Sequence, residues 1–143
     1  MQLDDLYRRV IMDHYKNPRN RGKFEDDAVT IDLNNPTCGD RISLQLKVED
    51  GIVKDAKYTG EGCSISMSSA SMMTEAVKGK TFEEAIEMAS RFSSLMKGEE
   101  VEFNDYEDIE ALSGVNKFPA RIKCATLAWN ALRKGIDGTE EKH

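Results

Sequence analysis

Apolar residues recur along the chain with helical spacing first, then alternate with polar ones, and then return to helical spacing. Residues 3–16 carry apolar side chains every three or four positions, which predicts an amphipathic helix that ends near Asn17-Pro18. Two stretches then alternate, at 29–33 and 42–48, and a third strand is predicted around 52–58. Alternation is typical of strands with one buried face, and Asp50-Gly51 marks a tight reversal between the last two. A three-stranded antiparallel sheet is therefore predicted.

The remainder of the chain follows a helical pattern. The predicted helices run from just after Cys63 to Val77, from the capping box Thr81-Phe82-Glu83-Glu84 to Met96, over about 105–112, and onward from about Pro119. The charged end, residues 137–143, is expected to fray. This order of elements indicates an α+β fold in which helices pack on the three-stranded sheet. The length of 143 residues suits one domain spanning 1–143.

The composition excludes several classes of partner. The net charge is −6, the isoelectric point is about 5.0, and Lys and Arg are dispersed along the chain. We therefore expect neither a nucleic-acid surface nor an anionic-membrane surface. The N-terminus has no signal-peptide pattern, and no apolar stretch is long enough to cross a bilayer. A cytoplasmic protein is expected.

Three cysteines carry the candidate chemistry, and none has a second cysteine close by in sequence. They occur in Asn35-Pro36-Thr37-Cys38-Gly39-Asp40, in Gly60-Glu61-Gly62-Cys63-Ser64, and after Phe118-Pro119-Ala120-Arg121-Ile122-Lys123 at Cys124. If Cys38 and Asp40 lead into a strand, their side chains share a face and can reach one ion. Cys63 comes directly before a helix, whose positive N-terminal end favours a thiolate. Three sulfurs and one oxygen make a candidate set of four ligands.

The residues alone leave the role of this set open. Structural disulfides are disfavoured in a reducing compartment, so metal binding, thiol chemistry and plain packing remain as explanations. Each cysteine could equally be a buried thiol, and Asp40 could be a turn residue. Three thiolates with one carboxylate suit zinc, and an iron–sulfur cluster accepts the same ligands. His14 falls on the apolar stripe of the first helix, so we expect a packed, hydrogen-bonded histidine rather than a ligand.

Four motifs, in order, give the chain a resemblance that covers nearly its whole length. They are Tyr15-Lys16-Asn17-Pro18-Arg19-Asn20, Asn35-Pro36-Thr37-Cys38-Gly39-Asp40, Gly60-Glu61-Gly62-Cys63-Ser64-Ile65-Ser66, and Phe118-Pro119-Ala120-Arg121-Ile122-Lys123-Cys124-Ala125-Thr126-Leu127-Ala128-Trp129. The chain resembles the SufU branch of the IscU/NifU-like iron–sulfur cluster assembly proteins. That resemblance implies the SufU/IscU-like fold. It also implies that the metal ligands are Cys38, Asp40, Cys63 and Cys124.

The resemblance further implies a function in sulfur transfer. A SufU-type protein is a zinc-dependent sulfur acceptor, or sulfurtransferase, that takes persulfide sulfur from a SufS-type cysteine desulfurase, an enzyme that uses pyridoxal phosphate. Cys38 is the expected sulfur acceptor, and Arg121 is a candidate docking residue for the desulfurase. Downstream partners would be other iron–sulfur assembly or acceptor proteins.

Three departures from the IscU scaffold proteins bear on the alternatives. Those proteins carry a histidine directly before the third cysteine, where this chain has Lys123, and their Leu-Pro-Pro-Val-Lys chaperone motif is replaced here by Phe118-Pro119-Ala120-Arg121-Ile122-Lys123. The stretch 98–117 looks like the insertion that separates SufU-type proteins from IscU. Three functions remain open: a zinc-dependent sulfur acceptor, a scaffold for a transient iron–sulfur cluster, and a structural zinc domain. Structural zinc sites typically use cysteine pairs close in sequence, which this chain lacks.

Overall fold

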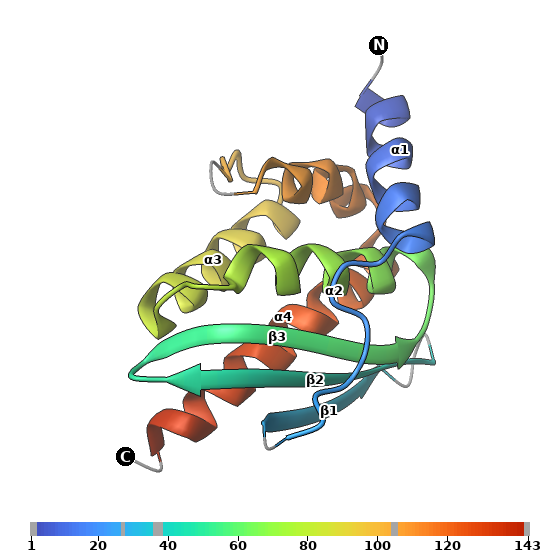
Figure 1. Ribbon diagram of the computed structural model, residues 1–143. Coiled ribbons are helices and arrows are strands. Elements are labelled where there is room, and N and C mark those ends of the chain that lie inside the picture. Colours follow the sequence, from blue (N-terminus) through green and yellow to red (C-terminus); the bar gives the residue numbers. More distant parts are fainter. Residues whose placement is uncertain (1–2, 27, 36–38, 104–105, 142–143) are drawn as a thin grey trace.

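The computed structural model describes residues 3–26, 28–35, 39–103 and 106–141. Figure 1 shows the order of its elements along the chain. They are helix α1 (Leu3–Lys16), strands β1 (Val29–Asn35), β2 (Asp40–Glu49) and β3 (Ile52–Glu61), helices α2 (Ser64–Val77) and α3 (Phe82–Met96), the 3₁₀ helix η1 (Glu107–Lys117) and helix α4 (Pro119–Glu141). The predicted α+β fold with a three-stranded antiparallel sheet is confirmed.

The sheet has the order β1-β2-β3, and both neighbouring pairs are antiparallel. Asp50 and Gly51 join β2 to β3 with positive φ angles of 53° and 74°, the conformation of a tight hairpin turn. Strict alternation gives β2 one buried face, to which Ile42, Leu44 and Leu46 contribute. This inner face is covered by helices.

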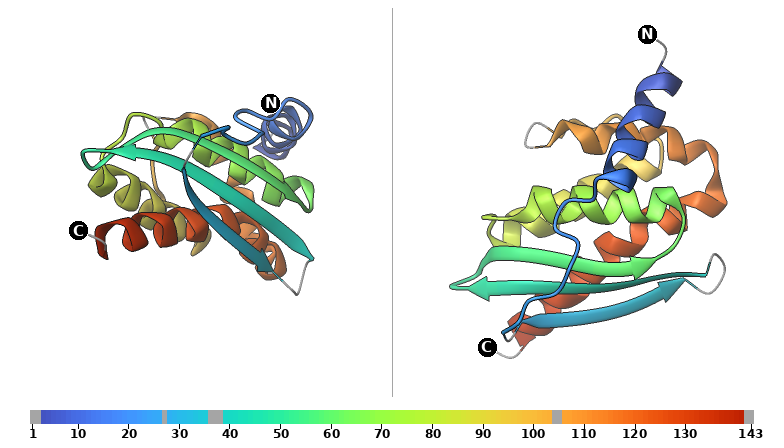
Figure 2. Two further views of the ribbon diagram at one scale, coloured as in Figure 1. Left: turned by 60° about the horizontal axis from the view of Figure 1, so that its bottom comes forward. Right: turned by 45° about the vertical axis from the view of Figure 1, so that its right-hand side comes forward.

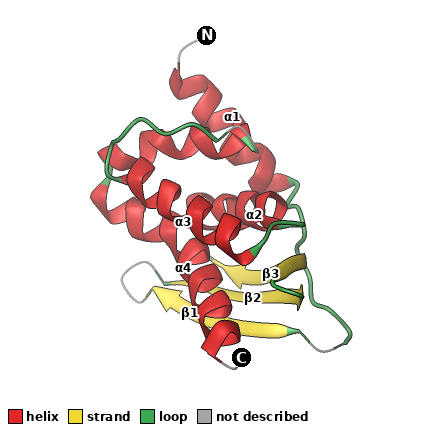
Figure 3. Cartoon of the chain, turned by 90° about the vertical axis from the view of Figure 1, so that its left-hand side faces the viewer, coloured by secondary structure: helices red, strands yellow, loops and turns green. Residues whose placement is uncertain are grey.

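Helices form two layers on that inner face. Helix α2 packs against β3, and helix α4 packs against β1 and β2 (Figure 2). Helix α1 and η1 lie on the far side of α2, while α3 packs against α4 and η1, so all five helices lie on one side of the sheet (Figure 3). The core is therefore continuous from the sheet to the outer helices, with Trp129 of α4 stacked on Phe92 of α3 at 5.0 Å between ring centroids. Within the described part of the chain, no helix is long and apolar enough to span a membrane.

The segment after α1 runs across the free edge of β3 and the outer face of the sheet. The Gly22 N–H donates to the Tyr58 carbonyl at 2.8 Å, and the Tyr58 N–H donates to the Asn20 carbonyl at 3.0 Å. Further along, the Phe24 N–H donates to Oε1 of Gln45 at 2.8 Å, and the Phe24 ring lies under the ammonium group of Lys47. The segment thereby satisfies part of the backbone at the β3 edge.

Local signals in the sequence predicted the helix starts well. The capping box is present as expected: the Glu84 N–H donates to the Thr81 hydroxyl at 3.1 Å, and the Thr81 N–H donates to the Glu84 carboxylate at 3.0 Å. Gly79 follows α2 with φ of 78°, as a C-terminal glycine does. The end of α4 differs from the expectation of fraying from residue 137, because the helix continues to Glu141.

The acidic helix expected over about 105–112 is instead a 3₁₀ helix that extends to Lys117. Its buried residues are Ile109, Leu112 and Val115, which lie three positions apart. Side chains at i and i+3 eclipse in a 3₁₀ helix, so this spacing buries one narrow face. The bond from the Phe118 N–H to the Val115 carbonyl, 2.9 Å long, closes the last turn in the same i to i+3 pattern.

His14 is a packed residue, as the sequence predicts. It is fully buried, and its Nε2 lies 2.8 Å from Oδ2 of Asp108 while its Nδ1 lies 2.8 Å from Oγ of Ser71. In the tautomer that these partners favour, Nε2–H donates to the carboxylate and Nδ1 accepts from the hydroxyl. The imidazole thus joins α1 to α2 and to η1.

Candidate metal centre

Three of the predicted ligands meet at one end of the sheet, although they come from three separate elements. Asp40 is the first residue of β2, Cys63 is the N-cap of α2, and Cys124 lies in the second turn of α4. One carboxylate oxygen and the two Sγ atoms all lie within 4.8 Å of one another. The fourth predicted ligand, Cys38, lies outside the described residues.

The carboxylate of Asp40 is held inside the protein. The residue is 1% exposed, and its Oδ1 accepts from the Cys63 N–H at 3.1 Å. Gly62 forms the wall beside it, because a Cβ at position 62 would lie 2.5 Å from Oδ1. The absence of a side chain at Gly62 therefore makes the space that the carboxylate occupies. This buried, hydrogen-bonded position differs from that of a solvated turn residue.

Cys63 presents its sulfur at the start of a helix, as the sequence predicts. Its Sγ accepts from the Ser66 N–H at 3.5 Å, so the sulfur takes the place of the usual hydroxyl or carboxylate cap. The same Sγ lies 3.9 Å from Oδ2 of Asp40. The residue is half-buried, which leaves the sulfur within reach of solvent or a partner.

Cys124 provides the enclosed side of the centre. It is fully buried, and its thiol lies 3.8 Å from the Ala120 carbonyl one turn earlier in α4. Helix α4 packs closely against the sheet along its length, and this packing holds its backbone in place. At Gly135, a Cβ would lie 2.6 Å from the Ile31 side chain, so helix and strand approach closely there.

The donor set fits a zinc ion. Tetrahedral zinc with bonds of about 2.3 Å to sulfur places two sulfur ligands about 3.8 Å apart. The three ligand atoms are within 4.8 Å of one another, so they need to close by no more than about 1 Å, which cysteine and aspartate rotamers permit. Soft thiolates with one hard oxygen also match the preferences of zinc better than those of calcium or magnesium.

The backbone that flanks the fourth predicted ligand is fixed on both sides. The Gly39 N–H donates to the Asn35 carbonyl at 2.8 Å, and Gly39 has a φ of 74°, which favours glycine. Asn35 and Asp40 are also paired across β1 and β2. The described residues on either side of positions 36–38, Asn35 and Gly39, therefore both lie beside Asp40.

Arg121 lies at the mouth of this centre. Its side chain is exposed, and its guanidinium group interacts with the thiols of Cys63 and Cys124. The negative charge that Cys63 can carry raises the pKa of Arg121 further, and a hydrogen bond with Cys124 acts in the same direction. The structure thus groups Arg121 with the predicted ligands, whereas its role in docking stays a prediction.

Phe118 is a rim residue for which the sequence predicts no role. It is 56% exposed, and its backbone is rigid because its carbonyl accepts from the N–H of Arg121 at 2.8 Å and from that of Ile122 at 3.2 Å. A phenylalanine next to a proline, ahead of the apolar stripe of α4, is the signal that could have indicated an exposed aromatic ring. It leaves an exposed aromatic ring three positions before Arg121.

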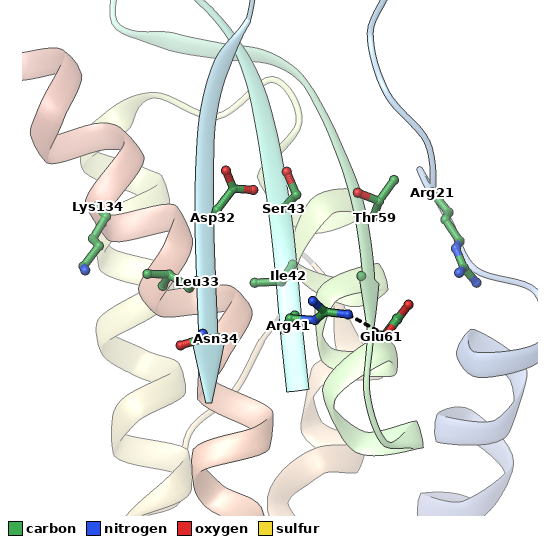
Figure 4. A pocket seen from close by; sticks show the side chains of 11 residues that line it. Arg21, Asp32, Leu33, Asn34, Arg41, Ile42, Ser43, Thr59, Glu61 and Lys134 are labelled. Carbon is green, nitrogen blue, oxygen red and sulfur yellow. Dashed lines mark hydrogen bonds and ion pairs between the residues drawn. The ribbon is translucent and has the colours of Figure 1, made fainter. Parts of the chain in front are cut away.

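A pocket of about 800 Å³ lies elsewhere, on the outer face of the sheet (Figure 4). Its lining mixes polar side chains with Leu33 and Ile42, and Figure 4 shows Arg41 of β2 paired with Glu61 of β3, with 2.9 Å between Nη2 and the carboxylate. Asp40 and Arg41 are consecutive in β2, so their side chains point to opposite faces. This pocket is therefore separated from the metal centre by the sheet itself.

The chain is similar to known proteins over nearly its whole length. Residues 6–143 match the family model described as the NifU-like N terminal domain. The chain is 63% identical over 135 residues to the zinc-dependent sulfurtransferase SufU of Bacillus subtilis (strain 168), covering 94% of this chain and 91% of that protein. It is 47% identical over 136 residues to the iron–sulfur cluster assembly scaffold protein IscU of Streptococcus pyogenes serotype M1, covering 94% of this chain and 85% of that protein.

Solved structures show the same fold. A candidate iron–sulfur cluster assembly scaffold protein for the SUF system from Fervidobacterium islandicum AW-1 superposes with a TM-score of 0.85 at 32% identity, covering 92% of this chain and 97% of that one. The N-terminal part of a NifU-like protein from Brucella abortus gives a TM-score of 0.90 at 23% identity over 98% of both chains, which shows a shared fold.

Proposed function

Because the chain belongs to the NifU-like N-terminal domain family, as its motifs predict, we propose that it is a zinc-dependent sulfur acceptor in iron–sulfur cluster assembly. The observation that carries this function is the grouping of Asp40 with the two sulfurs of Cys63 and Cys124 at one end of the sheet. A relative with high identity over nearly the whole chain is named as a zinc-dependent sulfurtransferase, which supports the same function. The proposed compartment is the cytoplasm, where thiols stay reduced.

In this proposal, Asp40, Cys63 and Cys124 would hold the ion, with Cys38 as the fourth ligand. Bound zinc keeps its sulfur ligands deprotonated while it lowers their nucleophilicity. The protein must therefore free one ligand to accept sulfur. Cys38 suits that role, since it directly precedes Gly39 in the sequence, and Gly39 has a positive φ of 74°, while the other three ligands are anchored in β2, α2 and α4.

The transfer itself is a thiol–disulfide type of exchange. The partner is a cysteine desulfurase, which carries a persulfide on its own cysteine. The Cys38 thiolate attacks the outer sulfur of that persulfide, a new sulfur–sulfur bond forms on Cys38, and the bond to the desulfurase cysteine breaks. The desulfurase sulfur leaves as a thiolate, so the step needs no external oxidant or reductant. A downstream assembly or acceptor protein then takes the sulfur.

The rim of the centre supplies the contact with the desulfurase. Arg121 is exposed beside the two thiols, and Phe118 presents its ring one turn earlier. Arginine and aromatic side chains are the residues that most often dominate binding energy at protein interfaces. Phe118 directly precedes α4 and Arg121 lies in its first turn, so the backbone of both residues is already hydrogen-bonded before a partner binds.

A Cys38→Ala variant tests the acceptor directly. The protein is mixed with a SufS-type desulfurase and cysteine, and the mass gain of one sulfur atom on the chain is followed by mass spectrometry. We expect the parent protein to gain sulfur and Cys38→Ala to gain none. Equal gain by both proteins would exclude Cys38 as the acceptor.

A second candidate function is a scaffold on which a transient iron–sulfur cluster is built and then passed to apo-proteins. It is favoured by the relatives that are named as IscU scaffold proteins. The same Asp40, Cys63 and Cys124 would then hold a cluster. Visible absorbance after anaerobic reconstitution, followed by transfer to an apo-protein, would support this candidate over the sulfur acceptor.

A further inference from the structure

Two neighbouring serines in the middle of α2 each donate a hydrogen bond to the backbone of a different helix. The Ser68 hydroxyl donates to the Ile11 carbonyl in α1, and the Ser69 hydroxyl donates to the Ala125 carbonyl in α4, both at 2.6 Å. Both serines are fully buried. These short bonds in a dry interior are directional, whereas the surrounding apolar contacts are not.

Only one of these two bonds joins the helices that carry sulfur ligands. Cys63 is the N-cap of α2, and Cys124 directly precedes Ala125 in α4. Ser69 is six residues beyond Cys63, which corresponds to about 9 Å along the helix axis at 1.5 Å per residue. The bond from Ser69 to Ala125 therefore lies less than two helical turns from the centre and sets the position of one ligand-bearing helix against the other.

We propose that Ser69 is a positioning residue of the metal centre, because its bond to Ala125 fixes the sliding of α4 along α2 and thereby the distance between Sγ of Cys63 and Sγ of Cys124. A shift of one helix by a fraction of a residue rise changes that distance directly. Ser69 has this role only if the centre binds metal as proposed above. Ser68 does not have it, since its partner Ile11 belongs to α1, which carries no ligand.

The serine can be removed without leaving an unpaired backbone group. The Ala125 carbonyl lies inside α4, where it also accepts the ordinary helical bond from the residue four positions later. Alanine is a better helix former than serine, which offsets part of the lost hydrogen bond. We therefore expect Ser69→Ala to fold and to lose little stability, while the helices gain freedom to slide.

Two matched variants, Ser69→Ala and Ser68→Ala, test the proposal in the full chain. Both remove a buried hydroxyl that makes a bond of the same length to a helix carbonyl. Urea unfolding of the zinc-free proteins gives their stabilities, competition with a chromophoric chelator gives their zinc affinities, and the visible spectrum of the cobalt-substituted proteins reports ligand geometry.

We expect the two variants to lose similar stability but to differ at the metal. Ser69→Ala should bind zinc about three- to tenfold more weakly than the parent and should change the cobalt spectrum, whereas Ser68→Ala should match the parent in both. Equal zinc affinities in the two variants, whether both reduced or both unchanged, would overturn the role of Ser69 and leave the metal centre standing. Failure of the parent itself to bind zinc would overturn the centre and, with it, the role of Ser69.

Discussion

Gly62 lies against the carboxylate of Asp40, so a methyl group added at this position tests whether that carboxylate belongs to the metal centre. In a Gly62→Ala variant the new Cβ would lie 2.5 Å from Oδ1, 2.9 Å from Cγ and 3.1 Å from Cβ of Asp40. Ordinary van der Waals contact begins at 3.4 Å, so the carboxylate must move by about 3.4 − 2.5 = 0.9 Å. Gly62 has no positive φ that would strain an alanine, so the effect is confined to this contact.

The size of the effect follows from what the carboxylate must do. A bond from zinc to oxygen is about 2.0 Å long, so a carboxylate that the new methyl group displaces by about 0.9 Å must be strained against that group to reach the ion. Disturbing the groups that orient metal ligands typically weakens binding by about 10- to 100-fold, or about 1.4 to 2.7 kcal/mol. Overpacking a buried site costs about 1–3 kcal/mol, and alanine partly offsets this cost because it lowers the conformational entropy of the unfolded chain. The free energy of unfolding of the zinc-free variant should therefore fall by about 1–2 kcal/mol.

The assay compares Gly62→Ala with Gly138→Ala, a change of the same kind at an open position. A Cβ at Gly138 meets nothing within 4 Å and lies in helix α4, so that variant should gain a few tenths of a kcal/mol to about 1 kcal/mol. Zinc affinity is measured by chelator competition and the stability of the zinc-free proteins by urea unfolding. We expect the affinity to fall only in Gly62→Ala. Parent-like zinc affinity in Gly62→Ala would refute the assignment of Asp40 as a ligand.

Three further predictions concern His14, Tyr106 and Arg121. Replacing His14 with alanine removes the buried partner of Asp108 and Ser71, so the free energy of unfolding in urea should fall by about 3 kcal/mol. Zinc affinity should stay unchanged, and a large loss of it would contradict a purely packing role for His14. Burial, together with the charge of Asp108, raises the pKa of Tyr106 to about 12, so the neutral phenol stabilises the fold below about pH 10 and this stabilisation is lost as the pH rises from about 10 to about 12. The Tyr106→Phe variant should therefore lose less stability than the parent protein between these pH values, and parallel pH profiles of the two proteins would contradict the shift. Arg121→Ala should keep its zinc but need about tenfold more protein for half-maximal stimulation of the desulfurase, and an unchanged concentration dependence would remove Arg121 from the interface.

Most of the fold could be predicted from short-range patterns in the sequence. The alternation in β2, the Asp50-Gly51 turn and the capping box at Thr81 each depend on residues within a few positions of one another, and each is present in the structure. The type of η1 was missed for a different reason. Its three buried side chains repeat every three residues, which favours a 3₁₀ helix, but a repeat of three and a repeat of 3.6 differ little over so few turns.

The prediction of the metal centre rested on two sources of information. Residue chemistry indicated the candidate ligands, and the resemblance to a family made the choice among buried thiols, turn residues and ligands. The resemblance implied that Asp40 and Cys124 meet, whereas residue chemistry could not, since these residues are far apart in the sequence and come together only because α4 packs against β2. The contacts of Gly62 and Ser69 are likewise tertiary, and no local pattern in the sequence marks them.

The most direct test of the central claim combines metal content with sulfur chemistry. Tag-free protein, purified without chelators, is analysed by mass spectrometry for metals, and desulfurase turnover of cysteine is measured with and without it. We predict about one zinc per chain, together with stimulated turnover that is lost when the zinc is removed and restored when it is returned. Iron with acid-labile sulfide in place of zinc, and no stimulation, would contradict the sulfur-acceptor function and assign the centre to cluster assembly.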